Sequence, residues 1–498
     1  MSTQNTSWHA RAASLTPDGR LFINGERVAA ADGQTFAKHS PLNGQLLAPV
    51  ARGQAADVDA AVRAARAAFA DRRWAGQPPR ARKKVLQRWA ELVLAAREEL
   101  ALLETLDMGK PIAHSLAVDV PATANCLAWY GEAIDKVYDE IAPTADTALA
   151  LITREAMGVI GAIVPWNYPL IMAAWKLGPA LAAGNSVVLK PSEKSPFTAL
   201  RLAELAVQAG VPPGVFNVVP GYGQEAGEAL ALHMEVDAIG FTGSTRIGRR
   251  MLACAAESNL KRVYNELGGK SAFVVFNDAK DVEAAARAAA GAVFYNQGES
   301  CNAPTRLLVQ QDVLPAFMAA LQDEAHKYLP GDPLNQSTEM GALVDAGQMS
   351  TVLGYIHQGQ AEGAHIAFGG RRVRTETGGY FVEPTIFEGV RNDMKIAREE
   401  IFGPVLGVIP FANEAEAVAL ANDSVYGLQA SVWTSQLDRA HRVARALRAG
   451  TVHVNQYDED DITVPFGGYK QSGNGRDKSL HALDKYTELK TTWLRISD

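Results

Sequence analysis

One cysteine of the chain lies in a short glycine-containing loop that follows an alanine-rich helical segment. Cys301 comes three residues after Gly298, and Asn302 and Pro304 follow it. In such a loop a thiolate can face a cleft and attack an electrophilic carbon. A cysteine can equally be a small buried apolar side chain without reactivity. The other motifs of the chain must therefore decide what Cys301 does.

A glutamate stands at the boundary between two expected blocks of strands and helices. Glu266 opens a Glu-Leu-Gly-Gly-Lys motif, and the boundary between two domains is a usual place for a ligand cleft. If the cleft raises its pKa, Glu266 can act as a general base. It can also be a boundary residue held in a salt bridge. Two further loops place an aromatic residue beside an acid or a glycine pair: Glu400-Ile401-Phe402-Gly403-Pro404 and Pro465-Phe466-Gly467-Gly468-Tyr469-Lys470.

Three expected strands end in residues that suit a bound nucleotide. Open parallel sheets bind ligands beyond the carboxyl ends of their strands, and those ends carry Pro165-Trp166-Asn167, Lys190-Pro191-Ser192-Glu193 and Thr242-Gly243-Ser244-Thr245. In the last motif a strand enters a helix, whose first N–H groups form an anion site for a pyrophosphate. Lys190 and Glu193 can address ribose hydroxyls, or they can be solvated surface residues. Gly221 and Gly223 form only a weak dinucleotide fingerprint, which is equally often a plain turn.

An alternation of strands and helices must position these residues. Strands are expected at residues 159–164, 186–190, 215–219, 236–241 and 261–265, with helices at 168–183, 196–209, 224–233 and 247–258. Repeated units of this length indicate an α/β fold with a parallel sheet covered on both faces. A second α/β block begins near Gly268, with a helix at residues 282–295 directly before the Cys301 loop and a strand at 381–387. Helical spacing also marks residues 80–106.

Two extended segments do not belong to either block. Residues 134–154 have the pattern of a hairpin arm, with turn residues Pro143 and Asp146. The tail at residues 488–496 alternates like an exposed strand, and such an edge needs another element or subunit to cover it.

Length and composition limit the class of protein. A chain of 498 residues exceeds one ordinary core, so two or three domains are expected. The net charge of -7, with acids and bases interspersed, favours a small-molecule partner over nucleic acid or a membrane. Three widely spaced cysteines predict neither a disulfide framework nor a metal site and fit a reducing cytoplasm. The polar N-terminus is not expected to be a signal peptide, and Pro165 and Pro169 interrupt the uncharged run at residues 156–175.

Taken together, in their order and spacing from about Leu21 onward, the motifs resemble the NAD(P)-dependent aldehyde dehydrogenase superfamily. The likeness is closest to the γ-glutamyl-γ-aminobutyraldehyde and 4-guanidinobutyraldehyde dehydrogenases of polyamine and arginine catabolism. It implies two Rossmann-like parallel-sheet α/β domains with a small β oligomerisation arm. The dinucleotide-binding domain would comprise residues 1–124 and 154–265, the catalytic domain residues 266–470, and the arm and tail residues 125–153 and 471–498. Homodimers or homotetramers are expected.

The resemblance also implies catalytic roles. Cys301 would add to the aldehyde carbon as a thiolate, and sulfur would later leave from a thioester. The side-chain amide of Asn167, with the backbone N–H of Cys301, would hold the oxyanion while hydride passes to NAD. Glu266 would then activate water to hydrolyse the thioester, and Lys176 and Asp477 would relay its proton.

The remaining site residues bind the cofactor or the substrate by the same resemblance. Lys190 and Glu193 would hold the adenosine ribose and favour NAD over NADP, and Ser244 the pyrophosphate. The cofactor site would also include Pro165, Trp166, Gly223, Gly243, Glu400 and Phe402. The aldehyde tunnel would be lined by Tyr168, Trp175, Tyr457 and Phe466. At its mouth the acidic loop with Asp460 and Asp461 would attract a cationic tail, unless it is only a solvated loop.

The sequence departs from the family pattern around the nucleophile. Ser300 and Asn302 flank Cys301 where smaller or apolar residues are more common, and Pro304 replaces a glycine. Because proline removes an N–H and restricts φ, the loop is expected to differ in shape. Two alternatives follow: a cysteine-dependent esterase or acyltransferase that needs no NAD, and an NAD-binding paralogue with impaired catalysis.

Overall fold

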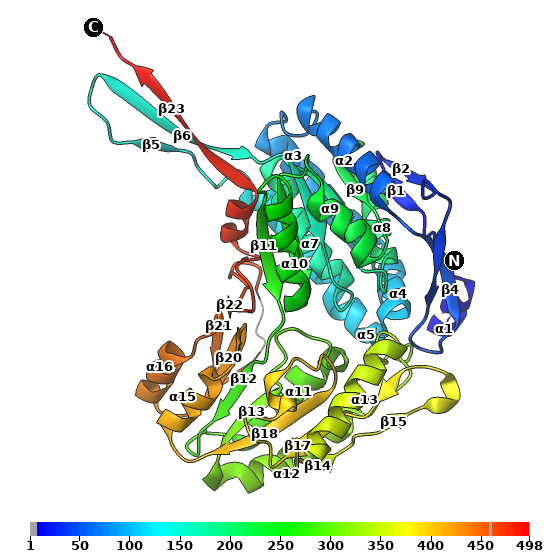
Figure 1. Cartoon of the computed structure of the whole chain (residues 1–498), viewed down its shortest axis with the longest axis vertical. Helices are drawn as coiled ribbons and strands as arrows, with labels where there is room; N and C mark the ends of the chain where they lie inside the picture. The colour runs from blue at the N-terminus through cyan, green and yellow to red at the C-terminus, as the bar shows by residue number, and fades with distance from the viewer. Residues whose placement is uncertain (1–6, 458–460, 498) are drawn as a thin grey trace, which may run out of the picture.

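The computed structural model describes residues 7–457 and 461–497. Figure 1 shows two sheets with their helices, one above the other, and a narrow arm that projects from the upper part. The upper part contains both N-terminal and middle segments of the chain.

Seven strands form the first sheet. Their order is β11 (Arg262–Leu267), β10 (Ala238–Gly243), β7 (Val159–Ile163), β8 (Ser186–Lys190), β9 (Phe216–Val218), β1 (Leu21–Ile23) and β2 (Glu26–Val28). Strands β11 to β9 pair in parallel, while β1 pairs antiparallel with both β9 and β2. Every residue of β7 and β8 is buried, as expected for strands covered on both faces. The predicted parallel sheet with alternating helices is confirmed.

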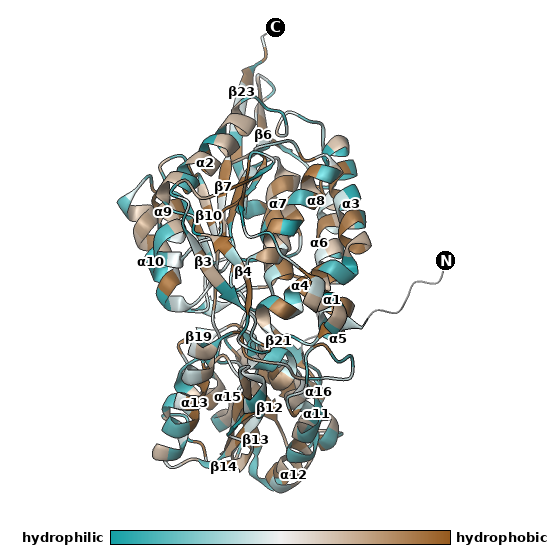
Figure 2. Cartoon of the chain, turned by 90° about the vertical axis from the view of Figure 1, so that its right-hand side faces the viewer, coloured by the Kyte–Doolittle hydropathy of each residue, from teal (hydrophilic) through white to brown (hydrophobic). Residues whose placement is uncertain are grey.

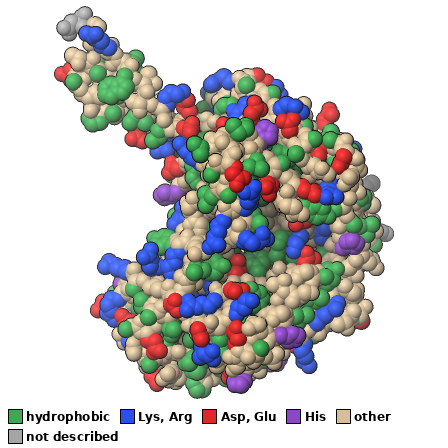
Figure 3. Space-filling view, viewed as in Figure 1, with side chains coloured by type: hydrophobic (Ala, Val, Ile, Leu, Met, Phe, Trp, Pro, Cys, Tyr) green, Lys and Arg blue, Asp and Glu red, His purple; other side chains and the backbone are tan. Residues whose placement is uncertain are grey.

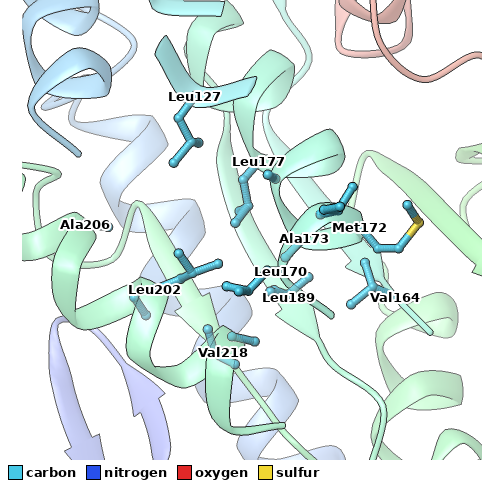
Figure 4. Close-up of a cluster of buried hydrophobic side chains, with 14 of the residues drawn as sticks. Leu127, Val164, Leu170, Met172, Ala173, Leu177, Leu189, Leu202, Ala206 and Val218 are labelled. Atoms are coloured by element: carbon cyan, nitrogen blue, oxygen red, sulfur yellow. The ribbon is translucent and has the colours of Figure 1, made fainter. Parts of the chain in front are cut away.

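Helices cover both faces of this sheet. One face carries α3 (Pro79–Ala95), α4 (Arg97–Met108), α6 (Val120–Ala133), α7 (Pro169–Ala183) and α8 (Phe197–Ala209). The opposite face carries α2 (Ala55–Ala70), α9 (Glu228–Leu232) and α10 (Thr245–Glu257). Alternate residues of a strand serve the two faces: Val187 and Leu189 of β8 join the first cluster, and Val188 joins the second. Figure 4 shows Leu189 between Leu170 of α7 and the side chains of α8.

Helix α7 is the central helix of the first face. Nearly all its side chains are buried, and it ends at Gly184, whose φ of 102° suits glycine. Figure 2 shows the hydrophobic residues concentrated in α7 and the adjacent strands, with hydrophilic residues on the outer helices. The segment expected as one helix at residues 80–106 is instead two helices, α3 and α4, that meet at Ala96.

The second sheet also has seven strands. Their order is β14 (His365–Phe368), β17 (Thr385–Glu388), β18 (Val405–Phe411), β13 (Arg306–Gln310), β12 (Ala272–Val275), β20 (Gln429–Trp433) and β21 (Thr451–Val454). Only β14 runs antiparallel to its neighbour. One face packs on α11 (Val282–Phe294) and α12 (Leu314–Ala325), and the other on α13 (Ala346–Ala361), α14 (Lys395–Arg398), α15 (Glu414–Asn422) and α16 (Leu437–Ala446).

The strand expected at residues 381–387 is split by Glu383 and Pro384. Its first part, β16 (Phe381–Val382), pairs with β15 (Arg372–Val373), and only β17 enters the sheet. Proline cannot donate a ladder hydrogen bond, which explains the break. The smaller elements are α1 (Trp8–Ser14), α5 (Ile112–His114), and the strand pairs β3 (Thr35–His39) with β4 (Leu46–Ala51) and β19 (Tyr426–Gly427) with β22 (Tyr469–Lys470).

A three-stranded antiparallel sheet forms the arm, in the order β23 (Thr487–Arg495), β6 (Ala148–Ala156) and β5 (Glu140–Ala142). The hairpin predicted at residues 134–154 is therefore present, and the tail is its third strand. Residues 125–133 belong to α6, which packs against α3 and α7. Within the described ranges, no helix has the length and apolar character needed to cross a membrane.

Candidate functional site

A cavity of about 740 Å³ lies between the two sheets. Figure 3 shows the molecule hollowed between its upper and lower parts, with lysine and arginine side chains at the rim. The cavity brings together residues from both α/β blocks. Its lining includes these predicted site residues: Pro165, Trp166, Asn167, Tyr168, Trp175, Gly243, Ser244, Glu266, Cys301, Glu400, Phe402, Tyr457, Phe466 and Asp477.

An unusual backbone bend brings Cys301 to this cavity. Helix α11 ends at Phe294, and the next turn holds Asn296, Gln297 and Gly298 at φ values of 50°, 59° and 70°. Residues other than glycine rarely adopt a positive φ. Three residues in succession with positive φ turn the chain sharply after α11. A Cβ atom at Gly298 would lie 2.2 Å from the carbonyl oxygen of Gly403, so only glycine fits there.

Hydrogen bonds from a distant loop hold the bend in place. The side-chain oxygen of Gln297 accepts from the N–H of Gly341 at 3.1 Å, and the buried carboxyl of Glu299 accepts from the N–H of Val344 at 3.0 Å. Burial raises the pKa of Glu299 well above its usual value. These bonds fix the segment directly before Cys301.

Asn167 is attached to the same loop. It follows β7 and is 3% exposed, and its side-chain nitrogen donates to the carbonyl oxygen of Glu299 at 2.8 Å. In return, Asn296 donates to the backbone carbonyl of Asn167 at 3.0 Å. The amide at the end of a first-sheet strand and the cysteine loop of the second block are thus one hydrogen-bonded unit.

Glu266 lies near the end of β11 and lines the cavity with 3% of its surface exposed. Neither of its carboxyl oxygens has a hydrogen-bond partner in the described chain. Burial raises its pKa well above the usual value, and the charge of Asp477 adds to the shift, while Lys176 opposes it. The raised pKa favours the protonated form of Glu266, and both of its oxygens are available to a ligand or water.

Behind Glu266 lies a buried ion triad. The carboxylate of Asp477 accepts from the ammonium groups of Lys176 and Lys485. Burial raises the pKa of Asp477, but the two ammonium groups outweigh it, so the net shift is downward. Asp477 therefore stays ionised, which is the state in which it raises the pKa of Glu266.

The strand ends expected to bind a nucleotide lie side by side in the first sheet. The ammonium of Lys190 lies 3.2 Å from the carboxylate of Glu193, whose side chain is 31% exposed. Burial lowers the pKa of Lys190. Neither residue lines the cavity. Gly223 does not line it either: it starts one π-helical turn, with open space where a side chain would be.

The β10–α10 junction does reach the cavity. Gly243 ends the strand and Ser244 caps the helix, since its hydroxyl accepts from the N–H of Ile247 at 3.4 Å. The first N–H groups of a helix have no partner within it. This junction can therefore hold an anion, and it lines the same cavity as Cys301 and Glu266.

Glu400 and Phe402 face this junction from the second block. A carboxyl oxygen of Glu400 accepts from the N–H of Gly269 at 3.2 Å, and burial raises its pKa to about 7. Phe402 has a φ of 57°, and its ring lies edge-on to Trp166 with centroids 5.1 Å apart. Gln348, which the sequence did not single out, donates to the carbonyl oxygen of Phe402 at 2.6 Å.

Aromatic rings line the other end of the cavity. Trp175 of α7 and Phe466 pack with centroids 5.1 Å apart. The hydroxyl of Tyr168 forms a 2.7 Å hydrogen bond with the hydroxyl of Ser300, beside the nucleophile. Tyr457 donates to the backbone carbonyl of Asn302.

Of the acidic loop at residues 458–461, the structure describes only Asp461. Asp460 lies outside the described residues. The carboxylate of Asp461 accepts from the N–H and hydroxyl of Thr463 and is not among the cavity-lining residues. Sequence reasoning also missed Glu339, Tyr328 and Gln429, which line the cavity from loops and strands far along the chain without any recognisable motif.

Comparisons with known proteins agree with this geometry. The model of the Aldehyde dehydrogenase family matches residues 28–492. The NADP/NAD-dependent aldehyde dehydrogenase PuuC of Escherichia coli (strain K12) is 54% identical over 489 residues, 98% of each chain.

Two solved structures have a TM-score of 0.97 and cover 98% of this chain and 99% of their own. They are the γ-glutamyl-γ-aminobutyraldehyde dehydrogenase of Burkholderia cenocepacia J2315, 59% identical, and a variant of the Pseudomonas syringae indole-3-acetaldehyde dehydrogenase AldA in complex with NAD+ and IAA, 57% identical. A cysteine-dependent esterase or acyltransferase that needs no NAD does not account for these matches, which include a relative solved with NAD+. The chain belongs to the aldehyde dehydrogenase family and is an NAD-dependent oxidoreductase that acts on aldehydes.

Proposed function

We propose that the physiological substrate is an ω-amino, ω-guanidino or γ-glutamylamino aldehyde of polyamine breakdown. Each of these carries a cationic amino or guanidino group in its tail, and the γ-glutamylamino tail carries a carboxylate as well. The composition of the cavity wall carries this proposal: among the described residues that line it there is no lysine, arginine or histidine, whereas Glu339 and aromatic rings are present. Such a wall favours a cation over an anion. The 59% identical relative from Burkholderia cenocepacia is named for a substrate of this class.

The side chains divide the reaction between them in a definite way. Cys301 attacks the aldehyde carbon as a thiolate and forms a thiohemiacetal. One N–H of the Asn167 side-chain amide donates to the carbonyl oxygen of Glu299. The second N–H of that amide, together with the backbone N–H of Cys301, stabilises the developing oxyanion. NAD, when bound, accepts the hydride that leaves the thiohemiacetal carbon. The thioester that results remains attached to Cys301.

Hydrolysis of the thioester falls to Glu266. Its isolated carboxyl must first lose a proton, after which it is a strong base because its pKa is raised. Once ionised, Glu266 takes a proton from a water molecule, whose oxygen attacks the thioester carbon. The ion pair of Lys176 and Asp477 lies near Glu266 and is the expected relay for that proton. The sulfur of Cys301 is then released from the carboxylate product.

The nucleotide residues fit an NAD molecule. The β10–α10 junction suits its pyrophosphate, the buried carboxyl of Glu400 suits the nicotinamide ribose, and Glu193 suits the hydroxyls of the adenosine ribose. Pro165, Trp166 and Phe402 form the wall between them. The negative charge of Glu193 repels a 2′-phosphate, so NAD is preferred over NADP.

A panel of aldehydes tests the substrate class. 4-Guanidinobutyraldehyde, its neutral isostere 4-ureidobutyraldehyde, indole-3-acetaldehyde and hexanal are compared by NADH absorbance, with Cys301→Ala as the control that should be inactive with all four. The guanidino aldehyde is expected to have the highest kcat/KM. If the ureido compound or the indole aldehyde matches it, the proposed class is wrong.

The apolar residues of the arm support a proposal about assembly. Tyr138, Ile141, Leu489 and Trp493 are exposed by 62% to 77% on strands or on the loop that leads to them. We place the arm sheet of β5, β6 and β23 between subunits of a homodimer or homotetramer, with residues 1–124 and 154–265 as the dinucleotide-binding domain and 266–470 as the catalytic domain. Of the segments first expected in the arm and tail, residues 125–133 lie in α6 and Asp477 lines the cavity, so these residues are left out of the intersubunit contact. Light scattering of Trp493→Asp should give a smaller mass than the unaltered protein. A cytoplasmic location fits the cysteine pattern.

A further inference from the structure

The cavity continues beyond Cys301 to an outer end that no motif marked. This end is lined by Val118 and Ala122 on one side and by Ala288, Gly291 and Ala292 of α11 on the other. The small residues of α11 leave room at its surface: a side chain at Gly291 would meet the hydroxyl of Tyr328 at 3.4 Å. Tyr328, Tyr295 and Glu339 complete the lining.

Four acidic residues line the cavity, and three of them have other tasks. Asp477 is neutralised by two buried ammonium groups, burial raises the pKa of Glu266 and so favours its uncharged form, and Glu400 is bonded to Gly269 on the nucleotide side. Glu339 differs because its side chain is 55% exposed and bears no lysine or arginine partner in the described chain. It is the lining carboxylate whose charge remains available.

The neighbouring His114 does not cancel the charge of Glu339. Its carboxylate lies 3.4 Å from Nε2 of His114, whose side chain is 14% exposed. Burial lowers the pKa of His114, although Glu339 opposes the shift, so the imidazole is neutral at pH 7. His114 also stacks on Tyr295 with centroids 4.6 Å apart. A neutral ring held in this way orients the carboxylate and leaves it negative.

We propose that Glu339, oriented by His114 and flanked by Tyr295 and Tyr328, binds the ammonium or guanidinium group at the far end of the substrate. The inference rests on the proposed function and names the residue that selects for it. The cation faces one carboxylate and two aromatic rings, which together favour a desolvated positive charge.

The test compares Glu339→Gln with the unaltered enzyme on 4-guanidinobutyraldehyde and 4-ureidobutyraldehyde. Glutamine keeps the shape and removes the charge, so kcat/KM for the guanidino aldehyde should fall about tenfold, mainly through KM, because the contact is remote from the reacting carbon. For the ureido aldehyde, and for the KM of NAD, the change should stay within about twofold. Glu283→Gln, on an exposed side chain at the start of α11, is the matched control and should behave like the unaltered enzyme.

Charge reversal sharpens the result. Glu339→Lys should lower kcat/KM for the guanidino aldehyde further and raise it for 4-oxobutanoate, whose tail is a carboxylate. A guanidino preference that survives intact in Glu339→Gln overturns the inference and leaves the proposed function standing. An equal loss with both aldehydes also overturns it, since it indicates a structural role. The absence of any guanidino preference in the unaltered enzyme refutes the proposed function itself.

Discussion

Replacement of Asp477 by asparagine tests the electrostatics behind the active site. The change removes one negative charge from a site where the side chains of Asp477 and Lys176 are 1% exposed and that of Lys485 is 5% exposed. Two ammonium groups are then left without their carboxylate. Because breaking one buried ion pair costs about 3–5 kcal/mol, the free energy of unfolding should fall by at least that amount.

The same change should alter catalysis in a specific direction. The charge of Asp477 raises the pKa of Glu266, whereas Lys176 and Lys485 lower it. In Asp477→Asn only the lysines remain, so the pKa of Glu266 should fall. Since Glu266 acts as the ionised base, the acidic limb of the kcat profile should move to lower pH, even if kcat itself is reduced.

Two measurements test these predictions for Asp477→Asn. Urea denaturation followed by tryptophan fluorescence gives the loss of stability, and NADH formation over a range of pH gives the position of the limb. Asp461→Asn, an exposed change in the same part of the chain, should alter stability by less than about 1 kcal/mol and leave the limb in place. An Asp477→Asn enzyme of unchanged stability, or a limb that stays or moves to higher pH, would refute the electrostatic argument.

Three other changes have equally definite outcomes. Glu266→Gln should retain a burst of NADH in rapid-mixing experiments but lose steady turnover. Because the pKa of Glu266 is raised in the folded state, its contribution to stability is complete only below about pH 4.5 and decreases as the pH rises. The Gln variant should therefore become more stable relative to the unaltered protein as the pH rises. Gly298→Ala should lower kcat on the order of 100-fold by displacing the nucleophile loop, with NAD binding retained in a fluorescence titration. Glu193→Gln should raise the ratio of NADP to NAD activity about two- to fivefold; an unchanged ratio would contradict its assignment to the ribose.

Much of the architecture could be predicted from the order of strands and helices. The runs at residues 159–164 and 186–190 are apolar throughout because both faces of their sheet are covered. Glycines and prolines at element ends show where the βα units begin and end. Such local signals do not show where tertiary packing divides a helix. Residues 80–106 have continuous helical spacing, yet α3 ends and α4 begins at Ala96.

For the site, the residue types alone left the roles of Cys301 and Glu266 open. The order and spacing of the motifs identified the family, and the resemblance then implied a role for each residue. Their ionisation states depend on surroundings that no motif contains. The pKa of Glu266 is raised because it is buried near Asp477, which is 211 residues further on, and the pKa of Asp477 is lowered because α7 and the tail supply two lysines.

Only the tertiary structure placed the acids that face a substrate. The acidic run 458–461 is conspicuous in the sequence, yet the carboxylate of Asp461 is bonded to Thr463 and does not line the cavity. Glu339 has no such signal, because a loop far from Cys301 in sequence reaches the cavity only after the two sheets have packed. The order of motifs in the sequence identified the family and its reaction, whereas the folded cavity decided which charges line it, since charge acts over distance in space and not along the chain.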